Sequence, residues 1–293
     1  MALTGKRASH LLAMLLLIAV APAIWAQEER PAWLALEQGH RYFDQGAFGD
    51  ALRSYQTALA EAGIMPEAEL GMARVYAAQA DDLLAIRFYR QALEQEDQFD
   101  LPELAHLARY ELAEIYRRQR RPEAYEETLL QVVAEDSFFT DPEEESTRRQ
   151  MREVLLVEGL DRLLVLYRLQ ELFSAEAHRR LAEHYVEGGR ESAIDYAMFA
   201  VVKVLTEAIS VYRERYFNYE FQSVVEFHRR LERQPLIREY LQEAGLYMSL
   251  FYLARSVENY QPRSGVAREI MATLLELGAS AGPWAGRAQR SLQ

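Results

Sequence analysis

The chain has 293 residues, half of them apolar, and its 45 acidic and 33 basic side chains leave a formal net charge of -12. An acidic surface repels phosphate backbones, which argues against nucleic acid as a partner. The absence of cysteine excludes disulfides, thiolate metal sites and a cysteine-linked lipid anchor. With only 14 glycines and 9 prolines among abundant helix formers, the composition predicts an all-α protein.

The first 26 residues have the order of a secretory signal peptide. Lys6 and Arg7 precede an uncharged apolar run over residues 11–21, which Pro22 ends. The run is shorter than the ~20 residues that span a bilayer, so we expect cleavage, after Ala26 or at the earlier small-residue site. Retention as an uncleaved anchor is the alternative. Either way, the rest of the chain is expected in the periplasm or otherwise outside the cytoplasm.

Residues 32–95 contain a repeat with a period of 34. Six positions match without a gap: Gly39, Tyr42, Ala51, Tyr55, Ala58 and Leu59 recur as Ala73, Tyr76, Ala85, Tyr89, Ala92 and Leu93. Small residues allow helices to cross closely and tyrosines fill the space beside the crossing, so the period indicates a repeated helical unit. Gly46 is expected to end the first helix.

Weaker copies follow along the chain. A third unit lies over residues 100–136, where Asp100 is expected to cap a helix with Glu103 as its reciprocal partner. A fourth lies over residues 174–207, with a turn at Gly188 and Gly189, and residues 248–290 hold a worn fifth unit. Residues 135–147 are the predicted linker, in which Asp141 caps a helix that has Pro142 at its first position.

The small, aromatic, small, aromatic, small pattern resembles the tetratricopeptide repeat (TPR) family. This resemblance implies an all-α solenoid of antiparallel helix pairs, wound as a right-handed superhelix, with a concave groove that binds peptides or partner proteins. We expect a signal peptide over 1–26, TPR-like repeats over 27–136, and a helical domain with degenerate repeats over 137–293. Projecting the alignment onto the groove gives the expected partner-binding residues: Leu36, His40, Phe43, Leu70, Arg74, Tyr110, Glu114 and Arg117.

These groove positions lack the lysine and asparagine pattern with which some TPR domains hold a peptide carboxylate. The expected mode is therefore apolar anchoring, with Arg74 and Arg117 orienting the peptide. The alternative is that Phe43 and Tyr110 only pack the superhelix.

Two stretches of the second half have special composition. Residues 191–217 predict a long helix that is apolar on most faces, and Lys203 and Glu207 argue for a buried helix and against a membrane span. The aromatic run of residues 212–221 is interpreted as core, with an exposed protein-contact patch as the alternative.

No catalytic, cofactor or metal site is expected. The histidines are scattered, and His178 and His184 are six residues apart, so they do not share a helix face. The arginine run of residues 117–121 is expected to complement the negative end of a helix, or alternatively to contact an anionic ligand or phospholipid. We therefore predict a non-catalytic scaffold that binds a protein or peptide in the cell envelope. The alternatives are a helical-solenoid cell-wall enzyme and a ligand-binding helper of a transporter, and the oligomeric state is left open.

Overall fold

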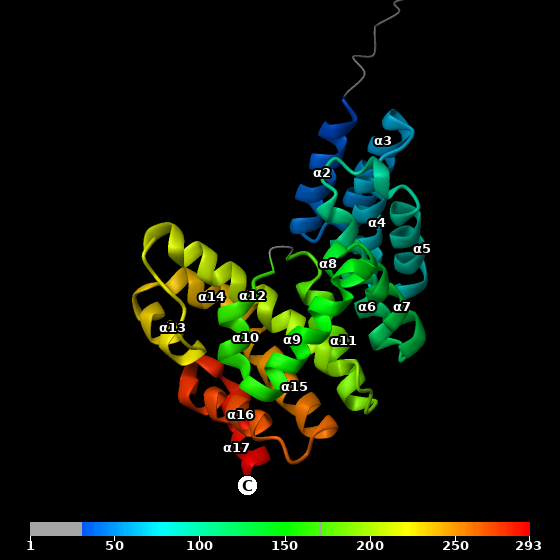
Figure 1. Cartoon of the computed structure of the whole chain (residues 1–293). Helices are drawn as coiled ribbons and strands as arrows, with labels where there is room; N and C mark the ends of the chain where they lie inside the picture. The colour runs from blue at the N-terminus through cyan, green and yellow to red at the C-terminus, as the bar shows by residue number, and fades with distance from the viewer. Residues whose placement is uncertain (1–30, 170–171) are drawn as a thin grey trace, which may run out of the picture. The chain divides into compact units, whose positions relative to one another are not determined.

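The computed structural model describes residues 31–169 and 172–293, and it is entirely helical over these residues (Figure 1). The all-α prediction is therefore confirmed. The predicted signal peptide, residues 1–26, lies outside the described residues. The chain divides at Asp100 into two compact units, which are considered separately below.

Over its described residues, 31–100, the first unit contains four α-helices and one 3-10 turn. In chain order these are α2 (Ala32–Asp44), α3 (Phe48–Ala62), α4 (Pro66–Ala78), α5 (Asp82–Leu93) and η1 (Glu96–Gln98). The helices pack as the neighbouring pairs α2 with α3 and α4 with α5, and α3 also packs on α4. The turn between α2 and α3 contains Gly46 at φ +72°, which favours glycine, so its expected role at the end of the first helix is confirmed.

The 34-residue pattern reappears as a pattern of burial. Ala51 and Ala85 are both fully buried, and Tyr55 and Tyr89 are exposed by only 1% and 2%. The Tyr55 ring lies against glycines of two different helices. A Cβ at Gly39 of α2 would come within 2.4 Å of the ring, and one at Gly71 of α4 within 2.5 Å. Glycine is required at both positions because the backbone approaches the ring directly.

One predicted cap is wrong. The helix after Asp100 begins at Glu103 and its N-cap residue is Pro102, with no side-chain cap. The backbone amide of Asp100 instead donates to the Glu67 carboxylate at 2.8 Å. Pro102 has helical backbone angles, so the turn that precedes Glu103 already follows the helix path and does not need a carboxylate at Asp100.

The second unit contains the remaining helices. They are α6 (Glu103–Arg118), α7 (Pro122–Ala134), α8 (Ser137–Thr140), η2 (Pro142–Glu144), α9 (Glu145–Glu158), α10 (Leu160–Leu166), α11 (Ala175–Glu187), α12 (Ala193–Arg215), α13 (Val224–Arg230), η3 (Leu231–Arg233), α14 (Pro235–Glu243), α15 (Leu246–Tyr260), α16 (Gly265–Leu277), η4 (Gly278–Ala281) and α17 (Pro283–Leu292). Neighbouring pairs again dominate, namely α6 with α7, α11 with α12, and α15 with α16.

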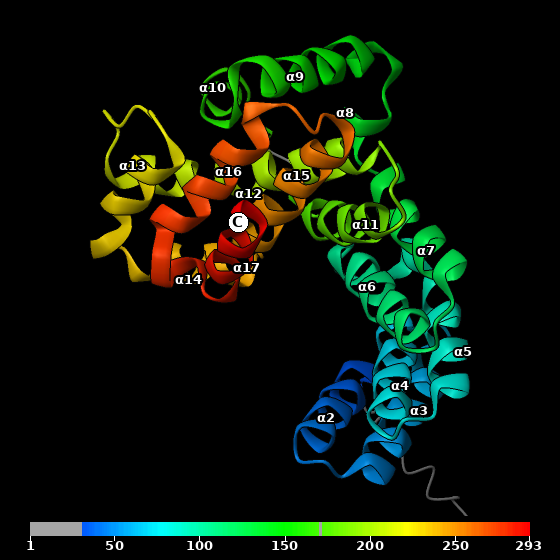
Figure 2. The same ribbon diagram turned by 90° about the horizontal axis from the view of Figure 1, so that it is seen from below.

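Helix α12 is the centre of the second unit. It packs on α9, α10, α11, α14 and α15, and the last of these lies alongside it (Figures 1 and 2). The helix is buried on most faces, as its composition predicts. No described helix, α12 included, combines the length and apolarity needed to cross a membrane.

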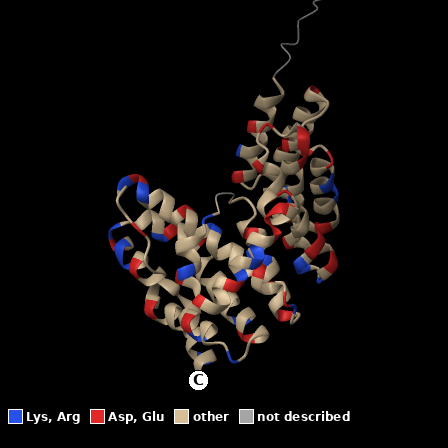
Figure 3. Cartoon of the chain, viewed as in Figure 1, with Lys and Arg blue, Asp and Glu red and all other residues tan. Residues whose placement is uncertain are grey.

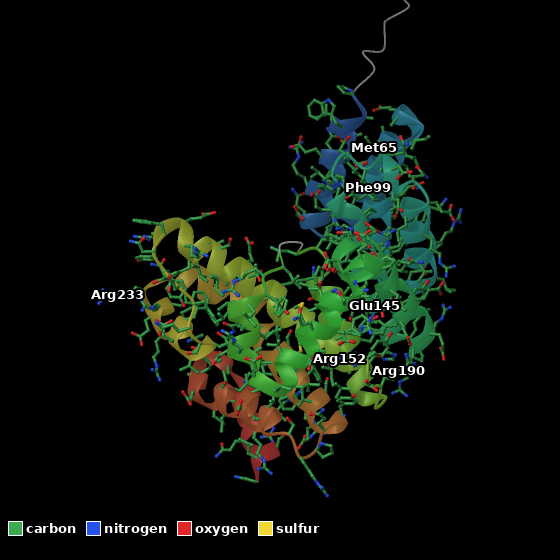
Figure 4. All side chains as sticks on the ribbon, viewed as in Figure 1. Met65, Phe99, Glu145, Arg152, Arg190 and Arg233 are labelled. Carbon is green, nitrogen blue, oxygen red and sulfur yellow. The ribbon has the colours of Figure 1, made fainter. Side chains whose placement is uncertain are left out.

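The predicted linker over residues 135–147 lies within the second unit and is largely helical. The Asp141 carboxylate accepts a hydrogen bond from the Glu143 amide at 2.9 Å, so its role as a cap before Pro142 is confirmed. Beyond it, Arg152 of α9 forms ion pairs with Glu191 and with Asp195 of α12 (Figure 4). These contacts attach α9 to the central helix.

Candidate functional site

The five groove residues predicted in the first unit have different exposures. Leu36 and Phe43 are half-buried and pack against the core, where the Phe43 ring lies 5.8 Å from that of Phe48. His40 is exposed, and its ring meets Tyr55 edge-on at 5.5 Å. Burial, and then the charge of Arg74, lower the pKa of His40, so its imidazole and this guanidinium lie near each other.

Leu70 does not belong to an accessible groove. Its side chain is only 2% exposed, which corrects its assignment as a partner-binding residue. Its neighbour Gly71 faces the Tyr55 ring, so this part of α4 is turned toward the core. Position in the repeat alignment alone does not reveal this rotation of the helix.

Tyr110, Glu114 and Arg117 lie on α6 in the second unit. The Tyr110 hydroxyl donates to the Phe173 carbonyl at 2.5 Å and accepts from the Ala177 amide at 3.2 Å. Tyr110 thus packs α6 against the start of α11, which is the alternative that the sequence left open for it. Arg117 donates two hydrogen bonds to Glu114, at 2.8 and 2.6 Å, and remains largely exposed.

Arg117 also lines a pocket of about 420 Å³ in the second unit. The pocket is formed by the turn between α6 and α7 together with the last turns of α11, and its lining is Arg117, Arg120, Arg121, Pro122, Tyr125, Glu183, His184 and Glu187. Arg117 comes from the last turn of α6, and Arg120 and Arg121 come from the turn that follows it, whereas the two glutamates come from α11, one helical turn apart. A ligand in this pocket meets both signs of charge within one small volume.

The walls of this pocket are held in place by partners outside it. The Tyr252 hydroxyl donates to Glu183 at 2.6 Å, and the Arg121 guanidinium stacks on the Tyr116 ring at 4.8 Å. Arg120 adopts a φ of +56°, a left-handed conformation that turns the chain between α6 and α7. The site is therefore fixed by packing and is positioned before any ligand arrives.

Tyr125 is the aromatic member of this pocket. It is only 5% exposed, and burial raises its pKa to about 12, so the phenol stays neutral at physiological pH. A neutral phenol offers a hydrogen-bond donor and an apolar ring edge. With arginines and carboxylates around it, the pocket can recognise an extended, dipolar segment.

Sequence reasoning missed a polar cluster in the core of the second unit. One oxygen of Asp136, the residue before α8, accepts from Ser174 at 2.7 Å, from His178 of α11 at 3.1 Å and from Lys203 of α12 at 2.9 Å. Each of the four side chains is at most 1% exposed. Aromatic rings enclose them, with Phe139, Tyr196 and Phe199 all within 5.6 Å of the His178 ring.

The electrostatics of this cluster keep Asp136 charged. Burial alone would raise the pKa of this carboxyl, but the His178 hydrogen bond and the Lys203 charge outweigh it and hold the pKa well below its ordinary value. Burial lowers the pKa of His178, and Asp136 opposes this only in part, so the imidazole is neutral. The cluster is thus an ion pair between the Asp136 carboxylate and the Lys203 ammonium, and the neutral Ser174 and His178 side chains each donate a hydrogen bond to the carboxylate.

A signal for the cluster existed in the sequence. Lys203 is the one lysine after residue 6, and it stands in a strongly apolar stretch of the chain. A lysine inside a helix that is buried on most faces needs a carboxylate partner. The sequence does not show which carboxylate, because Asp136 is 67 residues away in a stretch that reads as a polar linker.

The described residues contain no group of three or more histidine, aspartate or glutamate side chains arranged to hold a metal ion. Ser174, His178 and Asp136 are the residue types of a hydrolase triad, but the hydrogen bonds among them are arranged differently. Serine and histidine both donate to the carboxylate, whereas a nucleophilic serine would be hydrogen-bonded to the histidine. This set is a core network within the second unit.

A comparison with known proteins gives one similarity to describe. A protein of Treponema pallidum (strain Nichols), described as an uncharacterized protein, is 22% identical over 199 residues, which cover 67% of this chain and 53% of the relative. The chain thus spans about half the length of the curated relative that it matches. No family model matches the chain. The similarity therefore carries no activity or partner to this chain.

Proposed function

We propose that this protein is an exported, non-catalytic scaffold of the TPR type that binds a protein or peptide partner in the cell envelope. The fold that we propose is a solenoid of helix pairs. Its support is the 34-residue period, which coincides in the first unit with buried alanines and tyrosines at equivalent places. The export signal proposed for residues 1–26 places this binding outside the cytoplasm.

The pocket between the α6–α7 turn and α11 carries the proposal. It lies beside the last turns of α6 and α11, the first helices of two proposed pairs, and first helices line the groove that the TPR resemblance implies. Its charged groups come from the ends of α6 and α11 and from the α6–α7 turn, and Tyr125 adds an aromatic contact. Arginine and tyrosine are residue types enriched at binding hot spots. The occupant we propose is a peptide segment with an acidic and a basic side chain, or with a terminal carboxylate beside a basic side chain.

The position of the Asp136 cluster favours a scaffold over an enzyme. A general base or nucleophile must come within about 3 Å of the substrate atom on which it acts. In the second unit, the side chains that resemble such a set are enclosed by aromatic rings and are at most 1% exposed. Their role in this proposal is to hold the junction of α7 and α8 against α11 and α12.

A second candidate is a ligand-binding helper of a transporter. The volume of about 420 Å³ favours it, because small-molecule sites commonly enclose 300–1,000 Å³. In that case the occupant is a small zwitterionic solute that uses the same charged groups.

The test is capture of partners from an envelope fraction, with the pocket charges removed in one variant. Arg120→Asn with Glu187→Gln removes one charge of each sign from exposed positions, and asparagine tolerates the left-handed conformation at residue 120. We expect the captured partner to bind this variant at least tenfold more weakly in calorimetry, a loss of about 1.4 kcal/mol.

The matched control is Arg118→Asn with Glu127→Gln, which changes the same charges on exposed residues outside the pocket. Its affinity should equal that of the wild type. Equal binding by both variants would refute the pocket as the partner site. Binding of a small zwitterion without any protein partner would favour the transporter helper instead.

A further inference from the structure

The end of the second unit that contains α13 and α14 has a charge opposite to that of the rest of the chain. Residues 213–238 contain six arginines and four glutamates, a net of +2, which leaves -14 for the remainder of a chain with a total of -12. Figure 3 shows basic residues around the turns that flank α13. One of the four glutamates, Glu226, forms an ion pair with Arg230 and accepts a hydrogen bond from the Tyr219 hydroxyl at 3.0 Å.

Large apolar side chains stand out from this same end. The structure divides the aromatic run of residues 212–221: Tyr212, Tyr219 and Phe221 are buried, whereas Tyr216 is 40% and Phe217 is 78% exposed. Leu236, in the first turn of α14, is also 78% exposed. The core interpretation therefore holds for three members of the run, whereas Tyr216 and Phe217 are exposed and contact with a protein there stays a prediction.

The two exposed apolar positions belong to one surface. Gln234, two residues before Leu236, donates to the Tyr216 hydroxyl at 2.9 Å and so joins the start of α14 to the loop that contains Phe217. The Tyr216 ring stacks on Tyr212 at 4.5 Å and has the Arg215 guanidinium 5.9 Å from its centre. Arg233, labelled in Figure 4, lies at the outer margin of the second unit beside this junction.

This end, which we call the arginine–aromatic tip, consists of Arg213, Arg215, Tyr216, Phe217, Arg233 and Leu236. We infer that the tip docks on an anionic phospholipid bilayer, with Phe217 and Leu236 entering the boundary between headgroups and acyl chains while the arginines contact lipid phosphates. The inference is independent of the peptide pocket proposed above, which lies on other helices.

Three properties of the tip fit a bilayer. The apolar side chains protrude singly among arginines, as required for insertion of a few side chains at an interface. Arginine guanidinium groups match phosphate geometry and keep their charge at all physiological pH values. The local charge is positive although the chain is acidic, so an anionic surface attracts this end and repels the remainder, which orients the molecule.

The absence of cysteine from the chain makes a site-specific test possible. Phe217→Cys labelled with an environment-sensitive fluorophore, such as nitrobenzoxadiazole, reports the surroundings of the tip alone. We expect a blue shift and a gain in emission with vesicles of phosphatidylcholine and phosphatidylglycerol, and no change with phosphatidylcholine alone. Salt should reverse the change, because screening weakens attraction between exposed charges.

The control label is Leu83→Cys on α5, since Leu83 is 81% exposed and lies in the first unit. It should show no change with either kind of vesicle. This control also accounts for membrane contact through the apolar segment of residues 11–21, which does not act selectively on position 217.

Arg215→Gln with Arg233→Gln, in the chain labelled at position 217, should weaken vesicle binding at least tenfold, whereas Arg90→Gln with Arg149→Gln should leave it unchanged. Circular dichroism checks that each variant is folded. An unchanged signal at position 217, an equal change at position 83, or equal binding to phosphatidylcholine would each overturn the inference.

Discussion

Asp136 is buried with three hydrogen-bond donors on one of its oxygens, and Lys203 supplies the compensating charge. Such a pair adds little stability relative to a well-packed apolar core, but breaking it leaves one charge without a counter-ion in a region of low dielectric. At the scale of single residues, this asymmetry decides which substitutions the second unit tolerates.

Lys203→Met keeps the length of the side chain and removes its charge. We expect a loss of about 3–5 kcal/mol in the free energy of unfolding, because Asp136 then stays buried without a cation. Chemical denaturation monitored by circular dichroism measures the loss. Asp136→Asn together with Lys203→Met should recover part of it, and a double variant no more stable than the single one would count against the pairing.

The pH dependence of stability follows from the histidine in this cluster. The pKa of His178 in the folded state lies below its ordinary value of 6.5, so below that pH the unfolded chain binds a proton that the folded chain does not. His178 therefore causes stability to fall as the pH drops below 6.5. The lowered pKa of Asp136 acts separately: its contribution is present above the ordinary carboxyl pKa of 3.8 and is lost as the pH falls below it.

His178→Gln keeps a donor for Asp136 and removes the titration. Between about pH 6.5 and pH 5, the unfolding free energy of this variant should depend less on pH than that of the wild type, by up to about 1.4 kcal/mol per pH unit. His40 and His228 also have lowered pKa values, so the slope becomes shallower without reaching zero. Parallel pH profiles for variant and wild type would contradict this assignment.

At the scale of helices, the first unit depends on close backbone contact around one tyrosine. Gly39 of α2 and Gly71 of α4 both approach the ring of Tyr55 on α3, so the three helices share a single contact. The ring is 1% exposed and has little room to move. The glycines are therefore packing residues, although glycine lowers the intrinsic stability of a helix.

Gly39→Ala should destabilise the protein by about 1–3 kcal/mol, even though alanine favours the helix, because its Cβ would lie 2.4 Å from a Tyr55 ring carbon. Gly49→Ala on α3 is the matched control, since the nearest side-chain atom lies 4.0 Å from its Cβ. That variant should be neutral or stabilised by up to about 1 kcal/mol. Thermal unfolding of the pair tests the prediction, and equal shifts would refute the close contact.

At the scale of the whole molecule, the charge is distributed unevenly along the sequence. Residues 27–136 carry 22 acidic and 11 basic side chains, a net of -11, whereas residues 137–293 carry 23 and 20, a net of -3. The basic end at α13 and α14 lies in the less acidic part. The two proposed contacts, with a peptide and with lipid phosphates, thus use separate surfaces of the second unit.

Export is the prediction that concerns the molecule as a whole. If residues 1–26 are a signal peptide, the mature chain should begin at Gln27 and appear in the extracytoplasmic fraction. Intact-mass measurement of the protein purified from that fraction gives the new terminus. An uncleaved chain in the membrane fraction would identify the segment as an anchor, and an intact chain in the cytosol would refute export.

Much of the helical framework follows from the sequence alone, for reasons of local chemistry. Helix-forming composition predicts the all-α class, and Gly46 and Asp141 mark turns because positive φ and short capping side chains are local requirements. The 34-residue period predicts the buried alanines and the buried Tyr55 and Tyr89, since a repeated helix pair places equivalent residues at equivalent crossings. It is wrong for Tyr42, which is 38% exposed, and Tyr76 is only half-buried. The apolar stretch around Lys203 likewise predicts a buried helix.

Only the tertiary structure decided which distant residues meet. It buried Leu70, turned Tyr110 inward to bond the start of α11, and brought Asp136 to Lys203 across 67 residues. It also divided the aromatic run, so that Tyr216 and Phe217 are exposed while Tyr212, Tyr219 and Phe221 are buried. The physical reason is that helix rotation and the pairing of buried charges depend on packing between elements, which is a property of the folded chain and leaves no periodic trace in its sequence.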